Sequence, residues 1–111
     1  MGRMTIASDK MAELHRRLVE KRELASKIGA IYKFVLEGDG GGTFIVNLKD
    51  DVGVREGDGP APCTLRLPVA DGLALLDGKA NGQALFMSGK LKVEGDLGLA
   101  LKLSALTDIV K

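Results

Sequence analysis

His15 and Cys63 are the first candidates in this chain for acid–base and nucleophilic chemistry. They are the sole histidine and the sole cysteine of the sequence. An imidazole acts as a general base only beside a group whose proton it can take, and His15 lies among charged residues of a helical pattern. Cys63 falls on the apolar side of an alternating run, where a thiol is buried and inert. We therefore predict a solvated surface histidine, no catalytic residue and no enzymatic activity.

Other segments have the composition of ion-binding loops. The glycine run 38–42 and the pair Gly89–Lys90 are similar to phosphate-binding loops, but both lack the Gly-Lys-Ser/Thr ending and the following helix. Asp50 and Asp51 have the charge to bind a cation, although adjacent acids after a strand are typical of a turn. The single cysteine excludes an intramolecular disulfide and a multi-cysteine metal site. The sequence predicts no metal ion and no cofactor.

Length and composition limit the remaining classes of protein. The 111 residues suit one domain over residues 1–111, and the content of 45% hydrophobic and 28% charged residues is typical of a globular chain. A net charge of +1 gives no reason to expect a nucleic acid partner. No apolar run approaches the ~20 residues of a membrane span. A lone cysteine suits a reducing compartment, so we expect a cytoplasmic protein.

The first half of the chain changes from helical to strand periodicity. An apolar stripe with helical spacing predicts one amphipathic helix over residues 9–28, capped by Ser8 or Asp9 and ended by Gly29. The stripe consists of Met11, Leu14, Leu18, Ala25 and Ile28. Two alternating runs, 30–38 and 43–49, joined by the glycine turn, predict a hairpin. A shorter strand at residues 52–56 and a loop at residues 56–62 complete this half.

The second half alternates short strands with short helices. Residues 63–68 and 90–95 show the period-two pattern of strands. Between them, residues 69–78 and 81–89 are predicted to form two short helices, and Gly78 is predicted to end the first. No internal repeat or second domain is visible.

The closing segment, residues 95–111, fits two structures by its apolar pattern. Leucines at alternate positions fit a core strand, whereas Leu99, Leu103, Leu106 and Val110 fit one face of a core helix. We predict the helix, because Leu, Ala and Lys are good helix formers and Asp96 can cap its start. Its second side, Leu97, Leu101 and Ala105, is apolar too. Such a helix needs cover on nearly every side.

Several motifs, in order along residues 30–106, resemble the sterol carrier protein type 2 family. The strand "FIVNLK" is similar to the family's aromatic-x-x-Asp-Leu-Lys strand, with Phe44 in the aromatic place and Asn47 where Asp is usual. Further along, the chain keeps the family's Gly-Lys-x-Asn, its Gly-Lys-Leu-Lys-hydrophobic run, and its Gly-Asp before a leucine-rich last helix. These three motifs begin at Gly78, Gly89 and Gly95.

The resemblance implies a fold and a ligand class. The family fold is α+β, with a five-stranded, mostly antiparallel sheet, helices covering one face, and an internal apolar tunnel. The element order predicted from periodicity agrees with this fold. In the family the tunnel holds fatty acids, fatty acyl-CoA, sterols or phospholipids. The expected function is therefore intracellular lipid binding and transfer by a monomer or weak homodimer, with transient membrane contact.

A sheet face and the last helix are expected to form the wall of the lipid site. Without the resemblance, the apolar candidates would be ordinary core residues; with it, we expect them to line the lipid site. They are Val46, Leu48, Leu67, Leu73, Leu76, Phe86, Leu99, Leu103 and Leu106. Arg17 is the candidate for a carboxylate or phosphate, because its helix also carries the apolar stripe. Burying a sixteen-carbon chain contributes on the order of 12 kcal/mol before the cost of immobilisation. We expect broad lipid specificity, because one methylene changes binding by only about 1–3 kcal/mol.

The resemblance also implies an alternative role. The family occurs fused to peroxisomal β-oxidation enzymes and other lipid-metabolising enzymes, so an accessory module that presents lipid to such an enzyme, or assembles with it, is the second hypothesis. Peroxisomal members end in a Ser-Lys-Leu type tripeptide. This sequence ends Ile109-Val110-Lys111, and for that reason the cytoplasm is preferred over the peroxisome.

Overall fold

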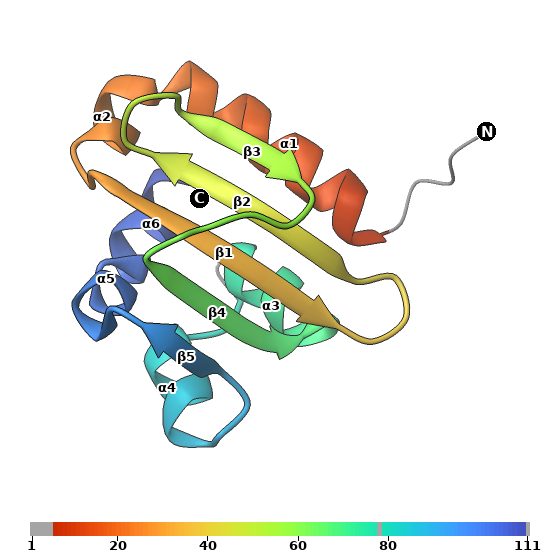
Figure 1. Cartoon of the computed structure of the whole chain (residues 1–111). Coiled ribbons are helices and arrows are strands. Elements are labelled where there is room, and N and C mark those ends of the chain that lie inside the picture. The colour runs from red at the N-terminus through yellow and green to blue at the C-terminus, as the bar shows by residue number, and fades with distance from the viewer. Residues whose placement is uncertain (1–5, 78, 111) are drawn as a thin grey trace.

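A five-stranded sheet forms the centre of the described residues, 6–77 and 79–110 of the computed structural model (Figure 1). The strands are β1 (Ala30–Glu37), β2 (Gly42–Leu48), β3 (Gly53–Glu56), β4 (Cys63–Pro68) and β5 (Lys92–Gly95). They lie in the order β3-β2-β1-β4-β5. Only the β1–β4 pair is parallel among these described strands, and the other neighbours are antiparallel. The predicted α+β class with a mostly antiparallel sheet is confirmed.

Alternation along the strands places one face of the sheet in the core. Tyr32 and Phe34 on β1 are buried, whereas the intervening Lys33 is only partly covered. The register sets Tyr32 opposite Val46 on β2 and opposite Cys63 on β4. Because neighbouring residues in register share a face, the apolar face is continuous across the three central strands.

Helices cover this apolar face (Figure 1). They are α1 (Ile6–Glu20), α2 (Arg22–Ser26), α3 (Val69–Leu76), α4 (Gly82–Met87), α5 (Leu97–Leu101) and α6 (Leu103–Val110). Gly72 of α3 packs so closely on β1 that an added Cβ would lie 2.5 Å from Leu36 Cδ2. Gly78, predicted to end α3, lies outside the described residues, as does Lys111.

The predicted first helix is present, but its boundaries differ from the prediction. The whole apolar stripe is buried, as its spacing indicates. The helix nevertheless begins by Ile6, so neither Ser8 nor Asp9 caps it, and Ser8 Oγ donates to Glu56 instead. It is also interrupted at Lys21, whose backbone leaves the helical region and whose Nζ donates to Ile109 O at 2.9 Å. The change of direction keeps Ala25 and Ile28, which follow the interruption, in the core.

The closing segment is helical, as predicted, but it forms two helices. Asp96 caps α5 with its side chain, which confirms the predicted start. Lys102 ends α5 after five residues and its Nζ donates to Ile28 O at 3.4 Å. The bend at Lys102 lets Leu103 and Leu106 turn into the core while Leu97 and Leu101 stay outside.

The loop between β3 and β4 crosses the other face of the sheet (Figure 1). Asp58 in this loop pairs with Lys33 of β1 at 2.7 Å. The bond from Lys33, followed by the N–H of Gly59, lowers the pKa of the Asp58 carboxyl below its usual value. Gly59 lies over the side chain of Ile45, which is therefore buried although it points away from the helices. The loop thereby returns the chain so that β4 runs parallel to β1.

Candidate functional site

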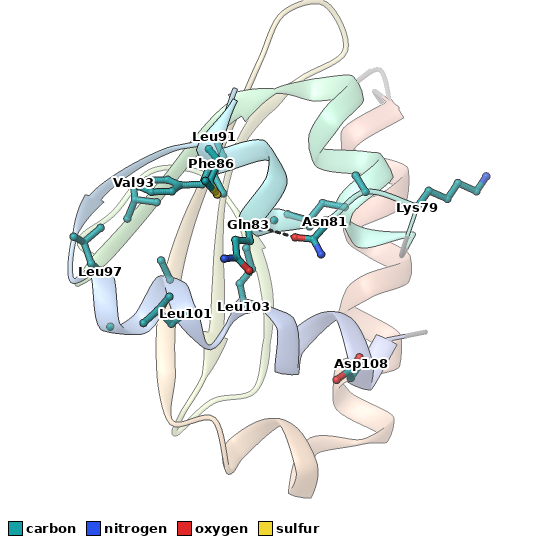
Figure 2. A pocket seen from close by; sticks show the side chains of 16 residues that line it. Lys79, Asn81, Gln83, Phe86, Leu91, Val93, Leu97, Leu101, Leu103 and Asp108 are labelled. Carbon is teal, nitrogen blue, oxygen red and sulfur yellow. Dashed lines mark hydrogen bonds between the residues drawn. The ribbon is translucent and has the colours of Figure 1, made fainter. Parts of the chain in front are cut away.

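A pocket of about 920 Å³ lies at the β5 edge of the molecule, between α4, β5, α5 and α6 (Figure 2). Its wall is mainly apolar: Leu75, Ala80, Gly82, Phe86, Met87, Leu91, Val93, Leu97, Gly98, Ala100, Leu101 and Leu103, with Lys79, Asn81, Gln83 and Asp108 as the polar members. Leu75, Leu91 and Leu103 are buried and form the inner part of this wall. The outer part consists of large apolar side chains that remain exposed to solvent.

Side-chain caps position the two short helices on either side of the pocket. Asn81 Oδ1 accepts hydrogen bonds from Gln83 N at 2.8 Å and Ala84 N at 3.1 Å, which starts α4. Asp96 Oδ1 accepts from Gly98 N at 2.8 Å, which starts α5. Helices of five and six residues have little stability of their own, so these caps, each typically worth about 1 kcal/mol, determine where the wall begins.

Gly95 brings the start of α5 close to β4. Its φ is +95°, and an added Cβ would lie 2.3 Å from Pro62 O. The following residue, Asp96, donates its backbone N–H to the same Pro62 oxygen at 3.0 Å. Only glycine combines this backbone conformation with this close approach, which gives the Gly-Asp motif a structural reason.

Tyr32 holds the middle of α5 from inside the core. Its hydroxyl donates to Leu99 O at 2.6 Å. Burial, and less strongly the nearby Cys63 and Asp96, raises the pKa of Tyr32 to about 12. The phenol therefore stays neutral and able to donate at any physiological pH.

The polar groups of the pocket lie toward its α3–α4 end and on α6. Gln83 lies between Phe86 and Leu103 in the view of Figure 2, whereas the Lys79 side chain extends away from the pocket. Asp108 lines the pocket from α6. Among the described residues, no three His, Cys, Asp or Glu side chains come together to hold a metal ion. The wall can surround an apolar molecule, with the amide of Gln83 and the carboxylate of Asp108 at its border.

The structure brings only part of the predicted wall to this pocket. Phe86 and Leu103 line it. The remaining apolar candidates belong to the core or its margin: Val46, Leu48, Leu67, Leu76 and Leu106 are buried, and Leu73 and Leu99 are partly buried. They lie on the sheet face under α1 and α3 or against it, whereas the pocket lies at the β5 edge. The internal tunnel that the resemblance implies is not shown, and contact of these core residues with a ligand stays a prediction.

The polar candidate for the site, Arg17, lies elsewhere, and so do His15 and Cys63, which were not expected to belong to a site. Arg17 is on α1, where its guanidinium pairs with Glu13 at 2.6 Å, and it does not line the pocket. His15 is an exposed residue, as predicted, but its Nδ1 accepts the N–H of Val54 at 2.9 Å and so joins α1 to the edge strand β3. Cys63 is buried as predicted, and burial followed by the charge of Asp96 raises the pKa of its thiol.

Several wall residues were not predicted from the sequence. Leu97 and Leu101 belong to the second apolar side of the closing segment. The apolar character of this side was the sequence signal that another group must cover it. Met87 and Leu91 follow Phe86 in the chain and lie on either side of the turn at Gly89, whose φ is +82°. The glycine predicts the end of α4, but not which side chains meet across the turn.

Comparisons with known proteins identify the family of this chain. Residues 11–108 match the family described as the SCP-2 sterol transfer family. The chain is 41% identical over 100 residues to sterol carrier protein 2 of Rattus norvegicus, covering 85% of this chain and 18% of that protein. It is 39% identical over 93 residues to hydroxysteroid dehydrogenase-like protein 2 of Xenopus laevis, covering 81% of this chain and 22% of that protein. The chain belongs to the SCP-2 sterol transfer family, and it spans about a fifth of the length of these relatives.

Solved structures share the fold over almost the whole chain. The apo form of sterol carrier protein 2 from Yarrowia lipolytica superposes with a TM-score of 0.81 at 28% identity, covering 99% of this chain and 95% of that one. Sterol carrier protein 2 from Aedes aegypti, solved in complex with the C16 fatty acid palmitate, has a TM-score of 0.76 at 21% identity, with 100% of both chains covered. At 21% identity, the similarity to the Aedes aegypti protein is evidence of a shared fold only.

Proposed function

We propose that this chain binds a lipid with a long apolar part in the pocket between α4, β5, α5 and α6, and carries it without covalent chemistry. The observation that supports this most is the pocket itself, about 920 Å³ with a mainly apolar wall. Pockets that bury small ligands measure about 300–1,000 Å³. Its exposed side chains lose unfavourable contact with water when an acyl chain covers them.

The ligand class is proposed from the wall and from relatives. A fatty acid, fatty acyl-CoA, sterol or phospholipid each has an apolar part for Leu75, Leu91 and Leu103 and a polar end for the border of the pocket. The Aedes aegypti protein of the same fold was solved with palmitate. We put the single-chain lipids first, because a flexible chain adapts to an open, leucine-lined wall.

Uptake of a fluorescent fatty acid by delipidated protein tests the proposal. Leu101 is 82% exposed and lines the pocket, whereas Leu24 on α2 is 52% exposed and does not line it. Leu101→Asp is expected to weaken binding by at least about tenfold, since a carboxylate in an apolar wall must be desolvated by the ligand. Leu24→Asp, the matched control, should leave affinity unchanged. Absence of uptake by the unmodified chain, or equal losses in both variants, would contradict the proposal.

How far the ligand enters the protein determines whether the wall candidates that lie in the core contact it. A fatty acid with a photoreactive group at its tail should label Phe86 or Leu103 if the chain stays in the pocket. Labelling of Val46 or Leu48 would instead show that the ligand parts the core and occupies an internal tunnel. Mass spectrometry of the labelled peptides distinguishes the two.

A second role is supported by the lengths of the relatives. The matched segment makes up 18% of the rat protein and 22% of the Xenopus protein, so domains of this family occur within much larger chains. We propose as the alternative that this domain presents lipid to, or assembles with, a lipid-metabolising enzyme. Native mass spectrometry separates the roles: a lipid-loaded monomer supports the carrier, and a lipid-free dimer the assembly module.

A further inference from the structure

One outer edge of the sheet is closed by a side chain. β3 and β5 are the two outer strands (Figure 1). The N–H of Val54 on β3 does not bond to β2, and His15 Nδ1 on α1 accepts it at 2.9 Å. A further strand can therefore pair with β3 only by displacing α1.

The other outer edge, along β5, is open. Asp96 donates its backbone N–H to Pro62 O at 3.0 Å, and this bond sets the alternation of the antiparallel pair β4–β5. Lys92 and Glu94 therefore lie in hydrogen-bonded pairs with β4, whereas Val93 between them turns its N–H and C=O outward. Among the described residues, no helix or loop bonds to these two groups of Val93. Such an edge is a template for another strand.

The sequence along the open edge is self-complementary in charge. Residues 90–96 read Lys-Leu-Lys-Val-Glu-Gly-Asp, so two lysines precede Val93 and two acids follow it at mirrored positions. If two copies of β5 pair antiparallel with Val93 at the centre, Lys92 of each copy lies opposite Glu94 of the other. Opposite charges in this position stabilise an antiparallel pair, and like charges destabilise it. A register centred on Lys92 or on Glu94 would place like charges opposite each other.

Within a single chain, Lys92 lies beside another cation. The register sets it directly opposite Arg66 of β4, an unfavourable arrangement for two like charges. Lys92 makes no ion pair with any other described residue. Glu94 bonds to Arg66 at 3.1 Å from the diagonal position. In the antiparallel pair of two copies, the partner's Glu94 lies next to Lys92 and supplies the missing anion.

Exposed apolar side chains flank β5 on its helix side. Phe86 and Met87 of α4 are 50% and 78% exposed, and Leu97 and Leu101 of α5 are 58% and 82% exposed. Gathered apolar side chains of this kind mark an interaction site. Antiparallel pairing sets the beginning of one β5 beside the end of the other, so α4 of each copy comes next to α5 of its partner. The apolar groups of the two copies then shield one another from water.

We propose that two copies of this chain pair edge to edge through β5, antiparallel, with Val93 at the two-fold axis of one ten-stranded sheet. The same surface serves both copies, as in most symmetric dimers. Because β5 has only four residues, we expect an equilibrium between monomer and dimer. The two pockets, each lined by Val93, then lie side by side on the helix side of the joined sheet. This pairing does not depend on a bound lipid.

Analytical ultracentrifugation with charge variants tests the pairing. The mass of the unmodified chain should rise from 11.7 kDa toward twice that value as the concentration approaches about 1 mM. Lys92→Glu alone and Glu94→Lys alone each place two pairs of like charges across the axis, and each should weaken dimerisation at least about tenfold. An equimolar mixture of these two variants restores both complementary pairs and should dimerise like the unmodified chain. Recovery in the mixture also verifies that each variant is folded.

A matched control lies on the closed edge. Arg55 is an exposed residue of β3, and Arg55→Glu makes the same change of charge as Lys92→Glu. This variant should dimerise like the unmodified chain. Lys92 and Glu94 do not line the pocket, so loss of the dimer and loss of fatty acid uptake are separate outcomes. A lipid-loaded dimer supports this proposal together with lipid carriage.

Amide hydrogen exchange tests the backbone pairing. A rise in concentration from monomer to dimer should slow exchange at Val93, because its N–H gains an acceptor on the partner strand. Exchange at Val54 should not change with concentration, since His15 already accepts that N–H.

Four results would overturn the proposal. The first is an unmodified chain that stays monomeric at about 1 mM. The second is a dimer that both single charge variants form as readily as the unmodified chain, which would place the interface elsewhere. The third is a mixture of the two variants that stays monomeric while the unmodified chain dimerises. The fourth is a dimer in which exchange at Val93 is as fast as in the monomer.

Discussion

The hydroxyl of Tyr32 donates a 2.6 Å hydrogen bond to the carbonyl oxygen of Leu99, 67 residues further along the chain. Tyr32 is on the central strand β1 and is completely buried, whereas Leu99 is on α5, whose Leu97 and Leu101 line the pocket. The bond therefore connects the middle of the sheet with the pocket wall. Since α5 has only five residues, the position of this wall depends on a residue that does not itself face the pocket.

Removal of this hydroxyl is expected to loosen α5 while leaving the core intact. In Tyr32→Phe the ring keeps its edge contact with Phe34, at a centroid distance of 6.3 Å. The Leu99 oxygen keeps the N–H of Lys102 at 3.0 Å, so no buried carbonyl is orphaned and the free energy of unfolding should fall by only about 1 kcal/mol. Urea unfolding measures this loss, and hydrogen exchange should increase in α5 more than in β1. Unchanged exchange in α5 would contradict the proposed anchoring.

The ionisation of Tyr32 predicts a loss of stability in strong base. Burial is the main cause that raises its pKa from 10.0 to about 12 in the folded chain. The folded state thus binds this proton more tightly than the unfolded state, so the contribution to stability is complete below pH 10 and is lost as the pH rises toward 12. The chain has one tyrosine and no tryptophan, so tyrosinate absorbance reports this residue alone. Titration at the ordinary pKa in the folded chain would refute the prediction.

Gly89 and Gly95 have similar backbone conformations, so substitutions at these two positions separate the cost of backbone strain from the cost of a close contact. Gly95 has φ +95° and Gly89 has φ +82°, but an added Cβ lies 2.3 Å from Pro62 O at Gly95 and meets nothing within 4 Å at Gly89. Gly89→Ala should cost only the left-handed backbone strain, about 1–2 kcal/mol. Gly95→Ala must also displace β4 or the start of α5, and we expect a cost larger by at least about 1 kcal/mol. Equal losses in thermal or urea unfolding would show that the close approach to Pro62 is not maintained.

His15 is expected to serve structure and not chemistry. The N–H of Val54 donates to its Nδ1 at 2.9 Å, so the neutral ring carries its proton on Nε2. His15→Ala should increase amide exchange at Val54 and lower the free energy of unfolding by about 1 kcal/mol. Lipid uptake by the folded variant should match that of the unmodified chain. A folded variant that has lost uptake would instead assign His15 to the binding process.

Periodicity was sufficient for most of the fold, because burial follows directly from which side of an element a residue occupies. The stripe of α1 and the alternation of β1 and β4 predicted the core positions Leu14, Phe34 and Leu65, all of them buried. The breaks at Lys21 and Lys102 were not predicted. Both residues are good helix formers, and their side chains bond to carbonyls at Ile109 and Ile28 that are distant in sequence.

The sequence by itself determined the order of the elements, the burial of Cys63 and the helical form of the closing segment, since each of these follows from local pattern. Its resemblance to a known family implied the α+β class. Only the tertiary structure decided which apolar residues face a pocket. Leu48 and Leu101 are the same residue type, yet Leu48 is fully buried under the helices, whereas Leu101 is 82% exposed and lines the pocket. The difference arises from the turn at Gly95 and the bend at Lys102, which direct the side chain of Leu101 on α5 away from the core. The position of a short helix relative to segments distant in the chain has no signature in the local sequence.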